Sequence, residues 1–169
     1  MKLKPVDLAL IALAVVIVLV AAVLLLSSGE STGDTVTTTV RLEFGSAGVP
    51  APINQGNDTV WTKVGNEWTR SSMANSSGTT TWTFRNLTSS SNCYEQLMAA
   101  AKIGGFPVGA ENQTMGIIVT DIAGDYNLEH ENRAWQYFVD GVYANKACNK
   151  FAITDGDVVV WRYITNQAT

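Results

Sequence analysis

The sequence predicts an α+β fold, in which a β-grasp-like mixed sheet packs against one helix and an N-terminal transmembrane helix precedes the domain. Three observations lead to this prediction. An uncharged apolar run extends from Leu8 to Leu26, several later segments alternate apolar and polar side chains, and one segment between them has helical periodicity. A helix followed by mostly antiparallel strands, with long apolar first and last strands, favours a sheet covered on one face by that helix.

The apolar run at the N-terminus is long enough to span a bilayer. At about 1.5 Å of rise per residue it approaches the roughly 30 Å thickness of the hydrocarbon core. It is longer than the core of a signal peptide, and no small-residue cleavage site follows it. Because Lys2 and Lys4 precede it, its leading end is expected in the cytoplasm. We therefore expect residues 1–7 as a cytoplasmic leader, 8–26 as a transmembrane helix in contact with the lipid bilayer, and an extracellular C-terminal part.

The remaining chain is predicted to be a short linker and one domain. Residues 27–34 are rich in Ser, Gly and Thr, which is typical of a flexible linker, and residues 35–169 match the usual size of a single domain. Thr35 to Phe44 alternates as a half-buried strand does. Residues 45–81 are dense in turn formers and read as an insertion, which carries a surface β-hairpin around Gly65-Asn66.

A helix is predicted after a resumed strand at residues 82–87. Asn92 suits the N-cap, and Glu95 three residues later completes a capping box. Gly104-Gly105 ends the helix, because glycine adopts the left-handed backbone conformation readily. Further strands are expected at 117–122, 135–139, 142–144 and 158–164, with turns at Asp140-Gly141 and Asp155-Gly156-Asp157.

Composition fits an extracellular domain and excludes one class of partner. The net charge is −4 and no basic cluster is present, so nucleic acid is not an expected partner. The two cysteines, Cys93 and Cys148, suggest a disulfide in an oxidising compartment, with two buried thiols as the alternative. Sequons for N-glycosylation begin at Asn57, Asn75, Asn86 and Asn112.

Residues 93–163 resemble the family of extracellular domains related to the C-terminal domain of transcobalamin, a β-grasp group often found in membrane-anchored surface proteins. Three blocks carry the resemblance: the helix that begins Cys93-Tyr94-Glu95, the aromatic strand and turn from Trp135 to Ala144, and the Gly-Asp turn and strand from Asp155 to Tyr163. The resemblance implies a binding module for a small ligand, with cobalamin as one candidate. The separate helical domain that completes the site in cobalamin carriers has no counterpart in this sequence.

Aromatic side chains are the expected ligand contacts, because they offer large amphipathic faces at modest entropic cost. Their alternation along strands is also typical of core packing. Tyr143 and Tyr126 lie near turns and are expected to be exposed. The candidate residues are Trp135, Tyr137, Tyr143, Trp161, Tyr163 and Tyr126.

The sequence predicts no enzyme, no catalytic residue and no bound metal. The single histidine, His130, lies between two glutamates, and no nucleophile motif accompanies it. Four aspartates could together ligate a calcium ion, but the Asp-Gly-Asp triplet is explained equally well by a hairpin turn. These aspartates are Asp121, Asp125, Asp155 and Asp157.

Two functions follow from these observations. The first is a membrane-anchored extracellular module that binds a small ligand or a cell-surface protein. The second is a pilin-like subunit, in which the helix at 8–26 leaves the membrane and self-assembles as the core of a filament. The short basic leader and Asp7 resemble pilin precursors, whereas Lys4-Pro5 is a poor processing site.

Overall fold

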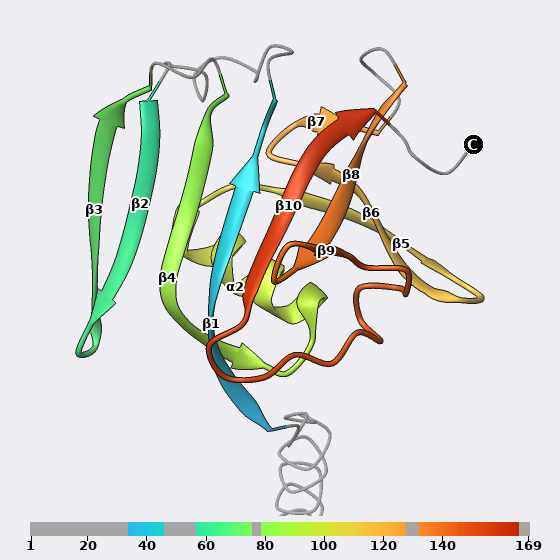
Figure 1. Cartoon of the computed structure of the whole chain (residues 1–169), viewed down its shortest axis with the longest axis horizontal. Helices are drawn as coiled ribbons and strands as arrows, with labels where there is room; N and C mark the ends of the chain where they lie inside the picture. The colour runs from blue at the N-terminus through green and yellow to red at the C-terminus, as the bar shows by residue number, and fades with distance from the viewer. Residues whose placement is uncertain (1–33, 46–56, 76–78, 128–131, 166–169) are drawn as a thin grey trace, which may run out of the picture. The chain divides into compact units, whose positions relative to one another are not determined.

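The computed structural model describes residues 34–45, 57–75, 79–127 and 132–165 (Figure 1). The predicted leader, the transmembrane helix at 8–26 and nearly all of the linker lie outside these ranges. Among the residues that are described, no helix has the length and apolar character needed to span a bilayer. Residues Gly33–Thr169 form one compact unit.

Within the described residues, seven strands form one mixed sheet in the order β3-β2-β4-β1-β10-β8-β9. The β1–β10 and β2–β4 pairs are parallel and the other pairs are antiparallel. The α+β class with a large mixed sheet is therefore confirmed. The strands are β1 (Thr35–Glu43), β2 (Asn57–Val64), β3 (Glu67–Ala74), β4 (Thr81–Ser90), β8 (Arg133–Val139), β9 (Val142–Tyr143) and β10 (Val158–Thr165).

The described residues contain one helix, α2 (Cys93–Gly104), and its ends are those that the sequence predicts. The Asn92 side chain accepts a hydrogen bond from the backbone N–H of Glu95 at 2.9 Å, which satisfies a donor at the N-terminus. Gly105 ends the helix with φ of 70°, and its N–H donates to the carbonyl of Ala101. The helix buries Leu97 and Ala100 against the sheet.

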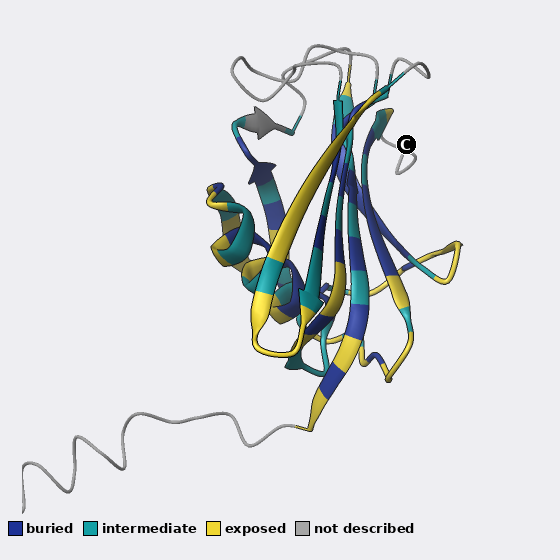
Figure 2. Ribbon diagram, turned by 90° about the vertical axis from the view of Figure 1, so that its left-hand side faces the viewer, coloured by how far each residue is buried: buried dark blue, intermediate teal, exposed yellow. Residues whose placement is uncertain are grey.

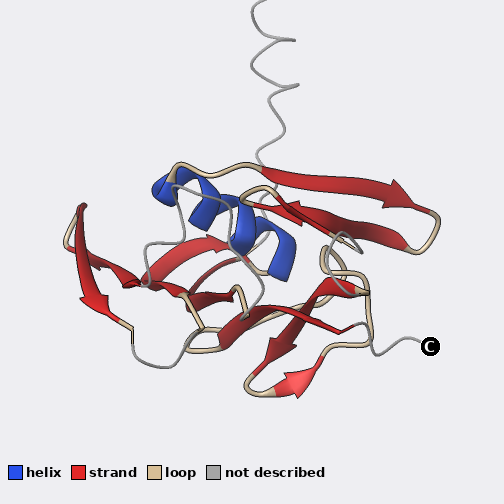
Figure 3. Cartoon of the chain, turned by 90° about the horizontal axis from the view of Figure 1, so that it is seen from above, coloured by secondary structure: helices blue, strands red, loops and turns tan. Residues whose placement is uncertain are grey.

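Three strands form a second sheet, in the order β5-β6-β7, and this corrects the prediction of one sheet. They are β5 (Val108–Gln113), β6 (Gly116–Ile122) and β7 (Asp125–Tyr126). The sequence predicts β6 but not β5, because β5 is largely exposed and has no apolar alternation. Figure 3 shows α2 and the β5–β6 hairpin side by side over one face of the large sheet.

The predicted hairpin is formed by β2 and β3, with Gly65 at φ of 61° in its turn. It is not a separate surface element, because β2 pairs with β4 and extends the large sheet. Trp61 of β2 is buried in the core, where its ring stacks on Phe84 at a centroid distance of 4.5 Å. Of the two strands of this hairpin, β3 at the sheet edge is the largely exposed one (Figure 2).

Candidate ligand-binding pocket

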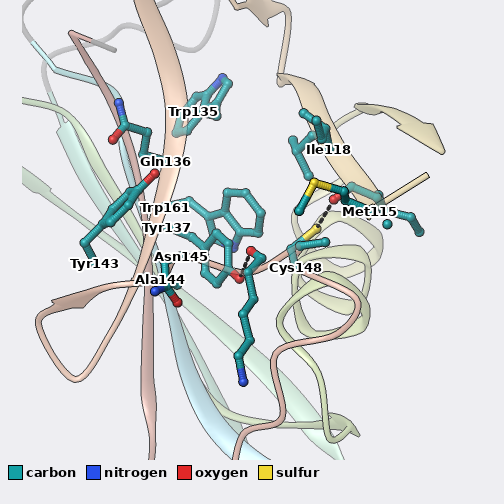
Figure 4. Close-up of a pocket in the computed structure, with 15 residues that line it drawn as sticks. Met115, Ile118, Trp135, Gln136, Tyr137, Tyr143, Ala144, Asn145, Cys148 and Trp161 are labelled. Carbon is teal, nitrogen blue, oxygen red and sulfur yellow. Dashed lines mark hydrogen bonds between the residues drawn. The ribbon is translucent and has the colours of Figure 1, made fainter. Parts of the chain in front are cut away.

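A cavity of ≈ 400 Å³ lies between the β8–β10 end of the large sheet and the β5–β6 hairpin. Trp135, Tyr137 and Trp161 form one wall, and residues 115–119 form the other. The segment from Ala144 to Cys148 completes the lining. Figure 4 shows the aromatic rings on one side of this space, with Ile118 and Met115 facing them across it. Its volume falls in the range typical of small-molecule sites, about 300–1,000 Å³.

Strand register places the aromatic wall. Trp161 of β10 pairs directly with Tyr137 of β8, so their rings share one face of the sheet with centroids 5.0 Å apart. Trp135 lies two residues before Tyr137 and therefore points to the same face. All three rings are mostly buried, and only part of each borders the cavity. The wall is consequently a continuation of the core.

The opposite wall is held against the 144–150 segment by hydrogen bonds between two side chains of that segment and the backbone of Ile117. The Oδ1 atom of Asn149 accepts a hydrogen bond from the backbone N–H of Ile117 at 2.9 Å. The Cys148 thiol donates to the carbonyl of Ile117 at 3.2 Å. Gly116 adopts φ of 131°, and a Cβ atom there would lie 2.5 Å from the Cβ of Ala147. A side chain at position 116 would therefore push the hairpin away from this segment.

Exposed apolar side chains gather at the rim of the cavity. Met115 is 83% exposed and Ile118 44%, and both line the cavity. Tyr143 is 45% exposed, but its ring packs on Phe138 at a centroid distance of 5.6 Å, on the face of the sheet opposite Tyr137. Val142, next to Tyr143, is also exposed. A cluster of large, solvent-exposed apolar side chains at a concave site is typical of a surface that binds an apolar partner.

The polar groups of the cavity are few. The Tyr137 hydroxyl donates to the carbonyl of Lys146 at 2.6 Å, and burial raises the pKa of this phenol above its ordinary value. The phenol therefore stays neutral at physiological pH. The indole N–H of Trp161 is buried and has no protein hydrogen-bond acceptor. Lys146 is the one charged residue of the lining, so no carboxylate opposes an acidic ligand there.

Four of the six predicted ligand-binding residues line this cavity: Trp135, Tyr137, Tyr143 and Trp161. Tyr163 does not, because it is fully buried in the core beside Trp135, with a centroid distance of 5.3 Å. Tyr126 belongs to β7, but its side chain lies outside what the structure describes. The facing wall from Met115 to Val119 was not among the predicted site residues. The alternation of β6 and the exposed Met115 at its turn are the signals that could have indicated it.

The predicted disulfide is absent from the structure, in which Cys93 and Cys148 are buried free thiols. The Cys148 thiol is engaged with the carbonyl of Ile117 instead of the Cys93 sulfur. Burial raises the pKa of Cys93 to about 12 and that of Cys148 to about 11. Both thiols are therefore protonated and poorly nucleophilic at neutral pH.

Three of the four candidate calcium ligands accept hydrogen bonds from backbone N–H groups. Asp155 accepts from the N–H of Thr37, and Asp157 accepts from the N–H of Thr154. Asp121 is buried and accepts from the N–H of Gly124. In the part of the chain that the structure describes, no three or more His, Cys, Asp or Glu residues gather as metal ligands. His130 lies outside that part, and so does the side chain of Asp125.

The four sequons lie in different surroundings. Asn112 is exposed on β5, and Asn57 is partly buried at the start of β2. The side-chain nitrogen of Asn75 donates to Asp58 and to the carbonyl of Thr79. The side-chain nitrogen of Asn86 donates to the carbonyl of Lys63 at 3.2 Å.

Comparison with known proteins gives one match to a protein family. The model of a domain of unknown function, DUF4430, matches residues 95–165. This segment contains most of α2, the β5–β6 hairpin and both strands of the aromatic wall, and it nearly coincides with the resemblance identified from the sequence at 93–163. No curated protein matches the chain.

Solved structures give matches of low identity. A proposed metal-binding protein from Ruminococcus gnavus matches with 12% identity and a TM-score of 0.38, covering 66% of this chain and 99% of that one. Haptocorrin in complex with Cbi matches with 13% identity and a TM-score of 0.42, covering 77% of this chain. This match spans only 25% of the haptocorrin chain.

Proposed function

We propose that residues 35–169 form a β-grasp-like binding module, which holds a small ligand with an apolar ring in the pocket between β8, β10 and the β5–β6 hairpin. The cluster of exposed apolar side chains at the rim of this pocket carries the proposal. Met115 and Ile118 lose contact with water only when something covers them, and burying apolar area is favourable by roughly 25 cal/mol per Å².

The pocket is suited to a ring because its deeper wall is aromatic. A planar ligand can pack against the edges of Trp135, Tyr137 and Trp161 while Met115 and Ile118 cover its other side. A hydrogen-bond acceptor on the ligand would also suit the buried indole N–H of Trp161, which lacks an acceptor within the protein. Cobalamin is one candidate ligand because of the sequence resemblance.

The place of action that we propose is the outer surface of a membrane. This rests on the sequence alone, since the apolar run from Leu8 to Leu26 follows Lys2 and Lys4. N-terminal sequencing of the mature protein tests it. A start at Met1 supports a retained anchor, a start near Pro5 supports the filament subunit, and a start after Leu26 supports a secreted protein.

Binding is tested by titrating the full-length chain in detergent with 1-anilinonaphthalene-8-sulfonate and, separately, with cyanocobalamin. Replacing Met115 by aspartate places a charge at the rim, and we expect it to weaken binding about tenfold or more, the loss expected when one apolar side chain no longer packs on the ligand. Met73→Asp is the matched control. Met73 is 69% exposed on β3, outside the pocket, so its replacement should leave binding unchanged.

Equal weakening by Met115→Asp and Met73→Asp would contradict the proposal, since it would mean that the probe binds apolar surface without preference for the pocket. Retained binding in both variants would contradict it too. Because both side chains are exposed, neither substitution should alter the fold, and circular dichroism checks this.

A further inference from the structure

A second concave site lies at the opposite end of the large sheet, under the β2–β3 hairpin. It is a cleft of ≈ 280 Å³, and it shares no lining residue with the aromatic pocket. Its lining combines indole rings, hydroxyl and amide groups, a guanidinium and the turn that follows α2. The lining residues are Asn57, Thr59, Trp61, Arg70, Ser72, Trp82, Gly104, Gly105, Phe106 and Pro107.

Two cross-strand rows build one wall of the cleft. In the first row, Trp61 lies between Phe84 of β4 and Arg70 of β3. In the second row, two residues away on the same face, Thr59 lies between Trp82 and Ser72. The edge strand β3 therefore places a guanidinium and a hydroxyl directly beside the indole rings.

The turn after α2 forms the facing wall. The ring of Phe106 packs on Trp82 at a centroid distance of 5.3 Å, which brings this turn close to the sheet. Gly104 allows the approach, because a Cβ atom there would lie 2.7 Å from the Phe106 ring and 3.0 Å from the Phe84 ring. The cleft thus has two fixed walls and opens beside Arg70.

Arg70 lies over an aromatic ring and forms no ion pair with a carboxylate of the described residues. Its guanidinium lies over the Trp61 ring at 5.3 Å from the centroid, while Phe84 stacks on that ring. A cation–π contact engages the charge of the guanidinium without using its N–H groups as hydrogen-bond donors to a carboxylate. No carboxylate of the described residues forms an ion pair with Arg70, and the cleft has no acidic lining residue.

We propose that this cleft binds a small acidic sugar, with its carboxylate on the Arg70 guanidinium and its hydroxyl groups facing Asn57 and Ser72. A planar carboxylate matches the fork of an arginine bidentately. The Asn57 amide and the Ser72 hydroxyl can form hydrogen bonds with the hydroxyl groups of the sugar. Phe106 and Pro107 offer apolar surface to its ring. The volume of the cleft suits a single ring better than a larger molecule.

The test is calorimetric titration of the full-length chain in detergent with D-glucuronate, D-glucose and cyclohexanecarboxylate. We expect glucuronate to bind at least tenfold more tightly than either of the others, because glucose lacks the charge and cyclohexanecarboxylate lacks the hydroxyl groups. Glucose binding as tightly as glucuronate would overturn the role of Arg70. Cyclohexanecarboxylate binding as tightly would overturn the assignment of a sugar.

Variants locate the site. Arg70→Gln should remove the preference for glucuronate over glucose, and Arg70→Lys, which keeps the charge but not the fork, should retain only part of it. Arg85→Gln is the matched control, since Arg85 is an exposed arginine on β4 outside the cleft. Met115→Asp should leave glucuronate binding unchanged, which separates this inference from the proposed function. Equal effects of Arg70→Gln and Arg85→Gln would overturn the proposal.

Discussion

Replacing Gly116 by alanine tests whether the close approach of the β5–β6 hairpin to the 144–150 segment forms the aromatic pocket. The backbone of Gly116 has φ of 131°, which L side chains rarely adopt. A Cβ atom would also lie 2.5 Å from Ala147 Cβ and 2.7 Å from Asn149 Oδ1, much closer than van der Waals contact. The substitution therefore forces either strain or displacement.

The cost of each response can be estimated. Keeping the geometry costs about 1–3 kcal/mol for the backbone and a further 1–3 kcal/mol for the overlap. Moving the hairpin away instead breaks the hydrogen bond from Ile117 to Asn149 and uncovers part of the pocket, at about 1 kcal/mol for the bond. Displacement is the cheaper response. We expect the free energy of unfolding to fall by about 1–3 kcal/mol and the bound fluorescent probe to be lost.

The assays are urea denaturation followed by circular dichroism, and titration with 1-anilinonaphthalene-8-sulfonate. Gly65→Ala is the matched control, because Gly65 also has positive φ, at 61°, but a Cβ atom there would have no neighbour within 4 Å. It should cost about 1 kcal/mol and leave probe binding intact. If Gly116→Ala bound the probe as Gly65→Ala does, the reasoning about the hairpin would be refuted.

Two further predictions concern the thiols and the helix. Because burial raises the pKa of Cys93 and Cys148 above the ordinary value of 9.0, the unfolded chain holds fewer thiol protons than the folded chain above that pH. The free energy of unfolding should therefore fall as the pH rises from 9.0 toward about 12. It should fall less steeply in the variant with both cysteines replaced by alanine. An equal fall in the melting temperature of the two proteins over this pH range would contradict the prediction. Asn92→Ala should lower the free energy of unfolding by about 1 kcal/mol in urea denaturation, because it removes the helix cap. Asn92→Asp, which can still cap, should be nearly as stable as the parent. Equal losses of stability in the two variants would contradict the capping role.

The features that the sequence predicted well are those that local chemistry determines. The ends of α2 follow from the cap at Asn92 and the left-handed Gly105, and neither depends on distant residues. The turn at Gly65 has the same character. The alternation in β8 and β10 identified Trp135, Tyr137 and Trp161, since side chains two residues apart on a strand share a face.

Features that depend on pairing between distant segments were missed. Nothing near Trp61 in the sequence shows that β2 pairs with β4, so the hairpin was expected on the surface although Trp61 is in the core. The split into two sheets depends on the pairing of β6 with β5. Because β5 has no alternation of apolar residues, the sequence does not indicate this strand. The pocket wall at Met115 faces the aromatic rings only because of this second sheet.

The two concave sites arise from one geometric mismatch between the sheet and its helix. Seven strands at about 4.8 Å spacing make a sheet about 29 Å wide, whereas the 12 residues of α2 make a helix about 18 Å long and about 10 Å across. The helix cannot cover the inner face, so each flank needs another cover. The β5–β6 hairpin covers one flank and leaves the aromatic pocket, and the turn after α2 covers the other and leaves the cleft.

One cross-strand row joins the two sites across this face. Leu42, at its centre, is fully buried and pairs with Trp82 on one side and Trp161 on the other. The row runs through Ser72, Thr59, Trp82, Leu42, Trp161 and Tyr137. A shift of the β1–β4 pairing by one residue would turn the rings of the cleft to the other face, and a shift of the β1–β10 pairing would do the same to the rings of the aromatic pocket. The sheet register therefore determines both sites together.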